Sequence, residues 1–470
     1  MSRLVKHLLT AFSGDAVARL LGFAATAWTA AAVQPEGFGV LSMGLALLAW
    51  ALWPVDLGLN TLGIRIAATP PQHRQFAPVA ILRLQCMAAV GVMVLGQLVL
   101  LLIPLSLPLR GVLQLYLLYP LTYALYVDWY HQGKRNYRAV TAGKFVSGGL
   151  YVGALMVMVK EPNQVALVPL LYFAANLAAA ALLLMMADRT DLRAAAAADA
   201  GAKASGGIGG YLPLLREGFP ILLGSIVGSV LQTAPLLLLG FLHGASDAGT
   251  LGVVLRVVTL LMMADRVFVA LYLPRVANLW GGDRQSLQRE LGRGFRLVVV
   301  AGGAIGAAAT VHADAIIALL FGPLYSAAGS ALQVVAWYAV ATLWNSFFAY
   351  GLVGIGQQQK YMKASLLGGA VFLPIVALAI WHDGLRGAAW GIAIGEGAMA
   401  LLMYLQFRRH CAVAVARPVA VGLAVAAATI VAGLMLGGGL MLLPVSLVIF
   451  FSLSLLTGNL TVADARFLRQ

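Results

Sequence analysis

The sequence predicts an all-helical polytopic membrane protein of about fourteen transmembrane helices, built as two six-helix lobes and a C-terminal helix pair. Composition carries this prediction: hydrophobic residues make up 61% of the 470 residues, charged residues only 10%, and the mean hydropathy is +0.90. A water-soluble globule has about 25% charged residues. Fourteen spans of about 20 residues use roughly 280 residues, and the remainder is too short for a sizeable soluble domain.

Composition and motifs also exclude several functions. Too little polar chain remains for a kinase, a nuclease or a nucleotide-driven pump, and the phosphate-binding pattern G-x-x-x-x-G-K-[ST] is absent from the sequence. The two cysteines, Cys86 and Cys411, form neither a disulfide framework nor a metal-ligand cluster, and the seven histidines lack ligand spacing. We therefore expect no catalytic residues, no metal site, no cofactor and no nucleic-acid partner.

Hydrophobic segments long enough to cross the bilayer recur along the whole chain. The predicted spans are residues 8–33, 39–62, 77–103, 111–132, 139–159, 165–187, 211–241, 248–273, 294–320, 330–355, 361–381, 387–406, 418–436 and 440–457. The last two carry no charge and are separated only by the glycines at 437–439. The number of spans falls to twelve if this final pair is re-entrant.

The longest polar interruption, residues 188–210, is rich in glycine, alanine and serine and has the composition of a flexible tether. It separates an N-terminal six-helix lobe, residues 1–187, from a C-terminal six-helix lobe, residues 211–410. Residues 411–470 form the C-terminal helix pair and tail.

Short matches between the two halves indicate a duplication. Asp56 precedes Arg65 at the end of the second span, and Asp265 precedes Arg275 at the end of the eighth. Each half has an even number of spans. The repeats are therefore parallel, related by an axis along the membrane normal.

The lysines and arginines predict the orientation in the membrane. Of the 31, 23 fall on the side that holds the N-terminus and five lie within spans. Only Arg110, Lys160 and Arg386 fall on the other side. Because Lys and Arg accumulate on the cytoplasmic side, both termini are expected to be cytoplasmic. The net charge of +14 mostly reflects this bias.

The cations within spans are the candidate substrate-binding residues. They are Arg19, Arg83, Lys144, Arg256 and Arg266. Each costs about 2.5–3.5 kcal/mol at the bilayer centre, so its retention needs a reason. Some can pair with acids, and Arg83 and Lys144 are near enough to a span end to extend to the interface. Arg19 and Arg256 are deeper, one in each half, and suit a multivalent phosphate held in a cavity between the halves.

Acids within spans are candidates for coupling or gating, together with the arginine that follows the second span. This set is Asp15, Asp56, Arg65, Asp265 and Glu396. Asp15 and Arg19 are four residues apart and can pair on one helix face, whereas the adjacent Asp265 and Arg266 point in different directions. Glu396 has no cation one turn away. It is a protonatable coupling site, a hydrogen-bonded structural acid or a partner for another helix.

Two segments are expected at the membrane surface. Residues 128–131, Asp-Trp-Tyr-His, end the fourth span, where aromatic side chains commonly anchor a helix at the interface. Residues 275–296 alternate leucines with arginines and are typical of an interfacial helix attracted to anionic lipid on the cytoplasmic face.

Several motifs together resemble the Wzx-type oligosaccharide flippases, which belong to the multidrug/oligosaccharidyl-lipid/polysaccharide export superfamily. Gln34-Pro-Glu-Gly-Phe-Gly39 and the segment from Asp56 to Arg65 are similar to the family's G-P-E-x-F-G … D-L-G-L … R opening, with Gln34 as a minor departure. Asp128-Trp-Tyr-His-Gln-Gly133 is similar to W-x-x-Q-G, and Phe321-Gly-Pro-Leu-Tyr325 to F-G-x-x-Y. The resemblance covers most of the chain.

The resemblance implies a V-shaped pair of lobes in the inner membrane of a bacterium. These lobes would move a polyprenyl-pyrophosphate-linked oligosaccharide from the cytoplasmic to the periplasmic leaflet by alternating access. The product would serve cell-surface polysaccharides such as the O-antigen of lipopolysaccharide. Expected partners are the lipid-linked oligosaccharide, membrane lipid and polysaccharide-assembly proteins, and the family's cationic cavity would map onto Arg19 and Arg256. The alternatives are a drug/cation antiporter of the same superfamily and a membrane glycosyltransferase or polymerase. An antiporter favours an acidic cavity, and an enzyme needs a large external loop.

Overall fold

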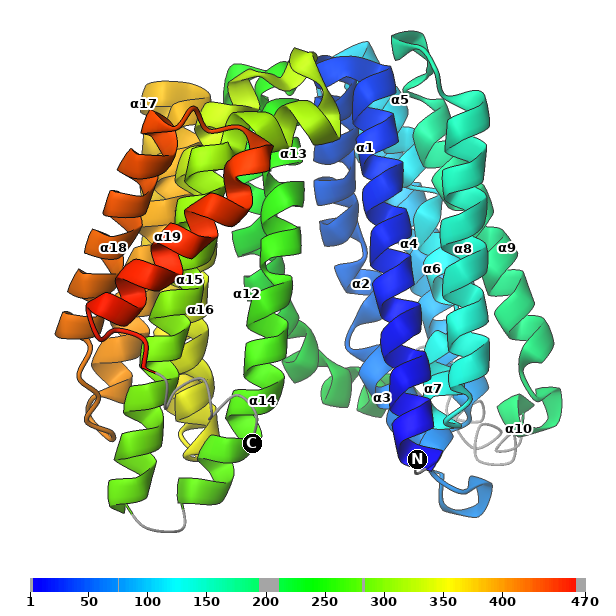
Figure 1. Cartoon of the computed structure of the whole chain (residues 1–470). Helices are drawn as coiled ribbons and strands as arrows, with labels where there is room; N and C mark the ends of the chain where they lie inside the picture. The colour runs from blue at the N-terminus through cyan, green and yellow to red at the C-terminus, as the bar shows by residue number, and fades with distance from the viewer. Residues whose placement is uncertain (1–2, 75, 194–210, 281–283, 462–470) are drawn as a thin grey trace. The chain divides into compact units, whose positions relative to one another are not determined.

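The computed structural model describes residues 3–74, 76–193, 211–280 and 284–461, without the side chains of 3–20, 220–221, 223–225, 227, 267, 270–271 and 284. All regular secondary structure in these ranges is helical, which confirms the predicted fold class. Nine helices in the described part of the chain are long and apolar enough to cross a membrane. The chain divides into two compact units, Met1–Thr233 (unit 1) and Ala234–Gln470 (unit 2), which Figure 1 colours from blue to green and from green to red.

Unit 1 is a helical bundle with several short helices at its ends. Its elements are α1 (Arg3–Ala51), α2 (Trp53–Asp56), α3 (Leu59–Ala68), η1 (Pro71–His73), α4 (Pro78–Leu102), α5 (Leu107–Tyr116), α6 (Tyr119–Leu125), α7 (Asp128–Gly133), α8 (Tyr137–Met158), η2 (Pro162–Gln164), α9 (Leu167–Met186), α10 (Arg189–Arg193) and the first part of α12 (Leu212–His243). α1 packs against α5 and α8, α8 against α9, α3 against α7, and α4 against α6.

Unit 2 contains longer helices. They are the second part of α12, α13 (Ala245–Leu261), α14 (Met263–Trp280), α15 (Arg284–Phe321), η4 (Pro323–Tyr325), α16 (Ala327–Gly354), α17 (Gln358–Phe407), α18 (Ala416–Met435), η5 (Leu440–Leu442) and α19 (Leu443–Leu456). α16 lies at the centre, because α13, α14, α15 and α17 all pack against it.

Two of the long helices are each a pair of spans joined by a tight kink. Gln34 has a φ of 62° inside α1 and is followed by Pro35, which cannot donate to the preceding turn. Asp383 and Gly384 leave helical geometry inside α17, and Gly384 has a φ of 50°, where a residue without a Cβ is favoured. The predicted spans 8–33 and 39–62, and likewise 361–381 and 387–406, lie on either side of these kinks.

Three predicted spans are interrupted where we expected continuous helices. Residues 39–62 are divided among α1, α2 and α3, with left-handed backbone at Leu57 and Gly58. Residues 111–132 are divided among α5, α6 and α7, with Pro120 at the start of α6 and non-helical backbone at Tyr126 and Val127. Residues 248–273 are divided between α13 and α14 at Met262. Apolar composition cannot predict such helix breaks, because the residues on either side of a break are equally hydrophobic.

The C-terminal pair α18–α19 packs against α15 (Figure 1). Gly303 on α15 faces the ring of Phe450, and Gly422 on α18 faces Val299. His312 on α15 is fully buried, with Nδ1 3.0 Å from the carbonyl oxygen of Gly438 and Nε2 3.1 Å from the hydroxyl of Ser446. Since a carbonyl only accepts, Nδ1 donates and Nε2 accepts. The pair is therefore held to α15 by glycine contacts and by one imidazole.

The aromatic group at 128–131 is not an interfacial anchor, contrary to our expectation. Trp129, Tyr130 and His131 are each at most 2% exposed and lie in the core of unit 1. The ring of Trp129 packs on Gly63 of α3, and His131 Nε2 donates to the carbonyl oxygen of Leu183 at 2.9 Å. Aromatic residues at a span end are compatible with both an interface and a core. Here Gly63 leaves room for the Trp129 ring, so the aromatic group packs into the core.

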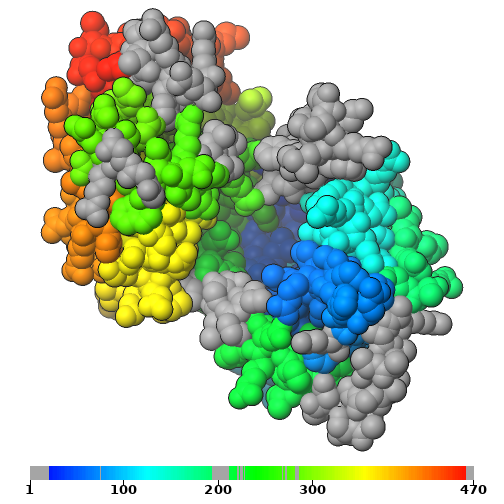
Figure 2. All heavy atoms as spheres, turned by 90° about the horizontal axis from the view of Figure 1, so that it is seen from below, coloured from blue at the N-terminus to red at the C-terminus, as the bar shows by residue number. Residues whose placement is uncertain are grey.

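The prediction of one interfacial helix over residues 275–296 is also wrong, because this segment belongs to two helices. Residues 275–280 end α14, and 284–296 begin α15. The two helices pack on each other. Leu287 and Leu291 join the core of unit 2 together with Ile355 at the turn between α16 and α17, so the start of α15 and this turn lie side by side at the end of unit 2 seen in Figure 2.

Candidate functional site

A chain of polar side chains crosses the apolar interior of unit 1. Tyr123 on α6 donates its hydroxyl to Asp56 Oδ1 on α2 at 3.3 Å, and Asn60 Nδ2 on α3 donates to the Tyr123 hydroxyl at 2.7 Å. Gln85 Nε2 on α4, from a fully buried side chain, donates to Asn60 Oδ1 at 3.1 Å. Gln85 Oε1 has no hydrogen-bond partner among the described residues. Through this chain of neutral side chains, Asp56 on α2 is connected to three other helices, α6, α3 and α4.

A break in the second span positions Asp56. Leu57 and Gly58, with φ values of 45° and 73°, occupy the left-handed region between α2 and α3. Leucine at such a φ is strained. The strained turn lies against α12, which packs on its backbone. A Cβ at Gly218 on α12 would overlap the carbonyl oxygen of Leu57. About two turns further along α3, Arg65 forms an ion pair with Glu217, so this coupling candidate joins α3 to α12 within unit 1.

The other unit 1 cations occupy different environments. Lys144 on α8 is half-buried and interacts electrostatically with Asp128, whose Oδ2 also accepts from Gln132 Nε2 at 3.0 Å. Arg83 is exposed on α4. The structure therefore associates Lys144 with an acid and leaves Arg83 on the surface of the unit.

A charge cluster outside the spans fixes the short helix α10. The Asp191 carboxylate lies 3.1 Å from Arg74 Nη2 and 2.8 Å from Lys134 Nζ, and accepts from the Tyr130 hydroxyl at 2.9 Å. The Arg74 side chain is fully buried and also donates to the carbonyl oxygen of Thr69 at 2.8 Å. Burial raises the pKa of Asp191, but these hydrogen bonds and charges outweigh it and hold the pKa below its ordinary value.

The acids of unit 2 meet on one turn of α16. Asn345 Nδ2 donates to Glu396 Oε1 on α17 at 2.9 Å, and the Glu396 side chain is buried. Ser346, the next residue, lies beside the carboxylate of Asp265 on α14, and the two carboxylates affect each other electrostatically. Buried Asp265 Oδ1 and Asn345 Oδ1 have no hydrogen-bond partner in the described part of the chain.

This arrangement parallels that of unit 1. Asp56 lies beside a helix break and contacts Tyr123 on the predicted fourth span, while Asp265 lies beside the break at Met262 and contacts Ser346 on the predicted tenth span. The second and eighth spans, and the fourth and tenth, are the pairs that the duplication predicted from the sequence makes equivalent.

The predicted substrate-binding cations of unit 2, Arg256 and Arg266, are both exposed. Arg256 falls in the middle of the candidate span Ala245–Arg266, on a face of α13 that it shares with the exposed Thr259. No carboxylate of the described residues forms an ion pair with Arg256. Arg266 is exposed on α14 and interacts with the neighbouring Asp265 through its charge. Arg256 is thus a guanidinium in an apolar segment without a protein counterion in the described chain.

Part of the predicted site lies outside the description. The backbone at Asp15 and Arg19 is helical, but their side chains are not among the described residues. Among the residues that are described, no group of three or more histidines, cysteines or acids could hold a metal ion.

Sequence reasoning missed the neutral partners of the acids. Tyr123, Asn60 and Gln85 surround Asp56, and Asn345 and Ser346 receive Glu396 and Asp265. A signal was available, since an amide inside an apolar span must find a hydrogen-bond partner. In each unit a carboxylate therefore lies beside neutral hydrogen-bonding side chains from other helices.

Comparisons with solved structures show the fold that this chain shares. A lipid II flippase, MurJ, in an inward closed conformation superposes with a TM-score of 0.68 at 9% identity, covering 98% of this chain and 100% of that one. An inward-facing multidrug resistance MATE-family transporter of the MOP superfamily gives 0.63 at 14% identity, covering 83% and 94%. A MOP superfamily transporter from Pyrococcus furiosus, described as having a binding pocket of reversed polarity, gives 0.51 at 14% identity, covering 86% and 94%.

At these identities the likeness concerns the fold alone. No curated protein matches the sequence. The family model described as polysaccharide biosynthesis protein matches residues 4–279, more than half of the chain. The chain therefore belongs to the polysaccharide biosynthesis protein family.

Proposed function

We propose that the protein is a flippase that moves a polyprenyl-pyrophosphate-linked oligosaccharide from the cytoplasmic to the periplasmic leaflet by alternating access. The transported lipid would supply a cell-surface polysaccharide such as the O-antigen of lipopolysaccharide. Membership of the polysaccharide biosynthesis family and the flippase- and transporter-type fold support this proposal. The protein acts without a catalytic step, in the inner membrane, with both termini in the cytoplasm.

The observation that carries the proposal is the placement of Arg256. A guanidinium in the middle of a span costs about 2.5–3.5 kcal/mol, and Arg256 has no ion pair with any described residue to offset that cost. A pyrophosphate offers several acceptor oxygens, and a guanidinium binds such groups with two parallel hydrogen bonds. Arg256 is therefore proposed to bind the pyrophosphate of the lipid.

The remaining candidates have supporting roles in this proposal. Further substrate-binding cations are Arg19, Arg83, Lys144 and Arg266, and the coupling or gating residues are Asp15, Asp56, Arg65, Asp265 and Glu396. Coupling by a proton is supported by the carboxylates of Asp265 on α14 and Glu396 on α17, which both lie beside one turn of α16, because like charges held close together in lipid favour uptake of a proton.

The membrane potential alone can drive the movement. A pyrophosphate with about two negative charges that moves to the positive side gains roughly 4–5 kcal/mol per 100 mV. Coupling to a cation would add to this gradient and is not required for net export.

The test is transfer of a fluorescent polyprenyl-pyrophosphate oligosaccharide across liposomes that contain the purified protein, read with a membrane-impermeant quencher. Loss of one charge-assisted hydrogen-bonding group costs about 1.5–3 kcal/mol. Arg256→Ala is therefore expected to slow transfer at least tenfold, and Arg256→Lys to recover part of the rate. Arg386→Ala is the matched control, because Arg386 is also exposed in unit 2 but falls at a span end. Transfer by Arg256→Ala at the parent rate would refute the proposal.

A second candidate function is a drug/cation antiporter, and the cluster of Asp265 and Glu396 favours it, since paired carboxylates in lipid attract cations. The two functions separate cleanly in liposomes with an imposed proton gradient. An antiporter exports a lipophilic cationic dye in exchange for protons, and Glu396→Gln abolishes that exchange. A flippase leaves the dye in place and moves the anionic lipid.

A further inference from the structure

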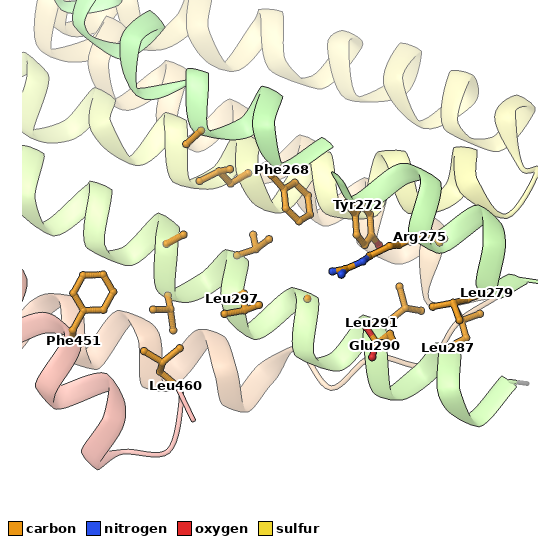
Figure 3. A pocket seen from close by; sticks show the side chains of 17 residues that line it. Phe268, Tyr272, Arg275, Leu279, Leu287, Glu290, Leu291, Leu297, Phe451 and Leu460 are labelled. Atoms are coloured by element: carbon orange, nitrogen blue, oxygen red, sulfur yellow. The ribbon is translucent and has the colours of Figure 1, made fainter. Parts of the chain in front are cut away.

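Unit 2 contains a cavity of about 500 Å³ between α14 and α15, which extends to α19 and the residues after it. Figure 3 shows Phe451 and Leu460 toward one end, Phe268 and Leu297 along the middle, and Arg275 farther along. Every residue of its lining comes from unit 2. Neither Arg256 nor the acids Asp265 and Glu396 are among the residues that line the cavity.

The lining is apolar over most of its length. Only Arg275 and Glu290 carry charge among the seventeen residues that form it. One leaflet of a bilayer core is about 15 Å thick, half of about 30 Å, so a cavity of 500 Å³ drawn out to that length has a section of about 33 Å². This section suits a single hydrocarbon chain. A polyprenyl chain is several times longer than an acyl chain and exceeds the space.

The charges define the polar part of the ligand. Arg275 from α14 and Glu290 from α15 both point into the cavity in Figure 3. Arg289 and Arg293 lie beside Glu290 on α15, and Arg293 Nη1 is 3.8 Å from the Glu290 carboxylate. Arg275, Arg289, Arg293 and Glu290 together carry a net charge of +2. An anionic head group complements it, and a zwitterionic one does so less well.

We infer that this cavity binds one acyl chain of an anionic phospholipid of the surrounding bilayer, with the phosphate at Arg275 and Arg293. The apolar stretch from Phe268 to Phe451 receives the chain, and the amphipathic start of α15 receives the head group. The pattern of leucines and arginines at 275–296 is explained by this site, because its leucines form the core and cavity wall while its arginines meet the lipid phosphate.

The probe is phosphatidylglycerol with a photoreactive group in one acyl chain, added to the full-length protein in nanodiscs of phosphatidylcholine. We expect labelled peptides to contain Phe268, Leu297 or Phe451. Ala301→Trp fills the cavity from an exposed lining position and is expected to reduce this labelling at least fivefold. Ala424→Trp, an exposed alanine on α18 that does not line the cavity, is the matched control and retains it.

The head group is tested separately. Arg275→Gln is expected to reduce labelling by the phosphatidylglycerol probe about tenfold and to leave labelling by the phosphatidylcholine analogue unchanged. Arg256→Ala is expected to leave both unchanged, which separates this site from the proposed transport function. Equal labelling of the parent and Ala301→Trp overturns the inference. So does labelling of these peptides by a photoreactive polyprenyl phosphate in preference to phosphatidylglycerol.

Discussion

Asp191→Asn is expected to destabilise unit 1 strongly, although Asp191 lies on a five-residue helix outside the spans. The Arg74 side chain has no exposed surface and Asp191 only 13%, so the substitution leaves a buried guanidinium without its carboxylate. Removing one partner of a buried ion pair costs about 3–5 kcal/mol. Asparagine keeps one acceptor oxygen for Tyr130 or Lys134, so we place the loss near 3 kcal/mol.

The assay is thermal unfolding of the purified protein in detergent, followed by the fluorescence of unit 1 tryptophans with those of unit 2 replaced by phenylalanine. For a unit of 233 residues, 1 kcal/mol corresponds to about 2–4 °C in Tm, which gives a decrease of about 6–12 °C. Asp383→Asn removes a carboxylate from an exposed position of unit 2 and should leave this Tm unchanged. A Tm for Asp191→Asn within about 1 °C of the parent would refute the reasoning.

The same carboxylate fixes the direction of the pH dependence. Since contacts with Lys134, Tyr130 and Arg74 outweigh burial, the pKa of Asp191 is lower in the folded protein than in the unfolded chain, where it is about 3.9. Its stabilisation is complete above the unfolded pKa and disappears as the pH falls through the folded pKa. The Tm difference between the parent and Asp191→Asn should therefore stay constant down to about pH 5 and shrink below about pH 4.

Three further predictions concern single side chains. His312→Phe removes the donor to the Gly438 carbonyl and the acceptor for Ser446. It should lower the free energy of unfolding of unit 2 by about 2–4 kcal/mol and therefore its Tm. An unchanged Tm would contradict the role of this imidazole. Gly218→Ala should displace α12 from the Leu57 carbonyl and reduce both Tm and transport, whereas Gly397→Ala, with open space around its Cβ, should do neither. Glu396→Gln should keep its hydrogen bond from Asn345 and hence the Tm, but remove the pH dependence of transport, and a pH profile identical to the parent's would argue against proton coupling there.

The sequence predicted the class of fold because the relevant signals are large and local. Charge scarcity and segments of about 20 apolar residues identify a helical membrane protein without any knowledge of packing. The kinks at Gln34 and at Asp383–Gly384 were also foreseen as gaps between spans, since proline and glycine interrupt helices for reasons of backbone geometry.

The contacts of the candidate residues were much less predictable. Arg74 was counted as a cytoplasmic loop cation, and its sequence neighbours give no sign that Asp191, 117 residues later, would bury it. Likewise, the neutral residues Asn345 and Gln85 can be recognised as part of the site only once the structure shows the acid or the amide that another helix places beside them. Pairings between distant helices depend on tertiary packing, which hydrophobic periodicity and charge bias do not encode.

The buried imidazole of α15 also sets a constraint on biosynthesis. Its two partners are far downstream, and Ser446 follows His312 by 134 residues. At about 5–20 residues per second, roughly 7–27 s pass between synthesis of the imidazole and synthesis of its hydroxyl partner. Throughout that interval α15 presents an unsatisfied polar group and a glycine-lined face to the membrane. Nascent chains paused before α18 should therefore be the form that membrane quality-control proteases recognise, and synonymous codons that slow translation there should lower the yield of mature protein.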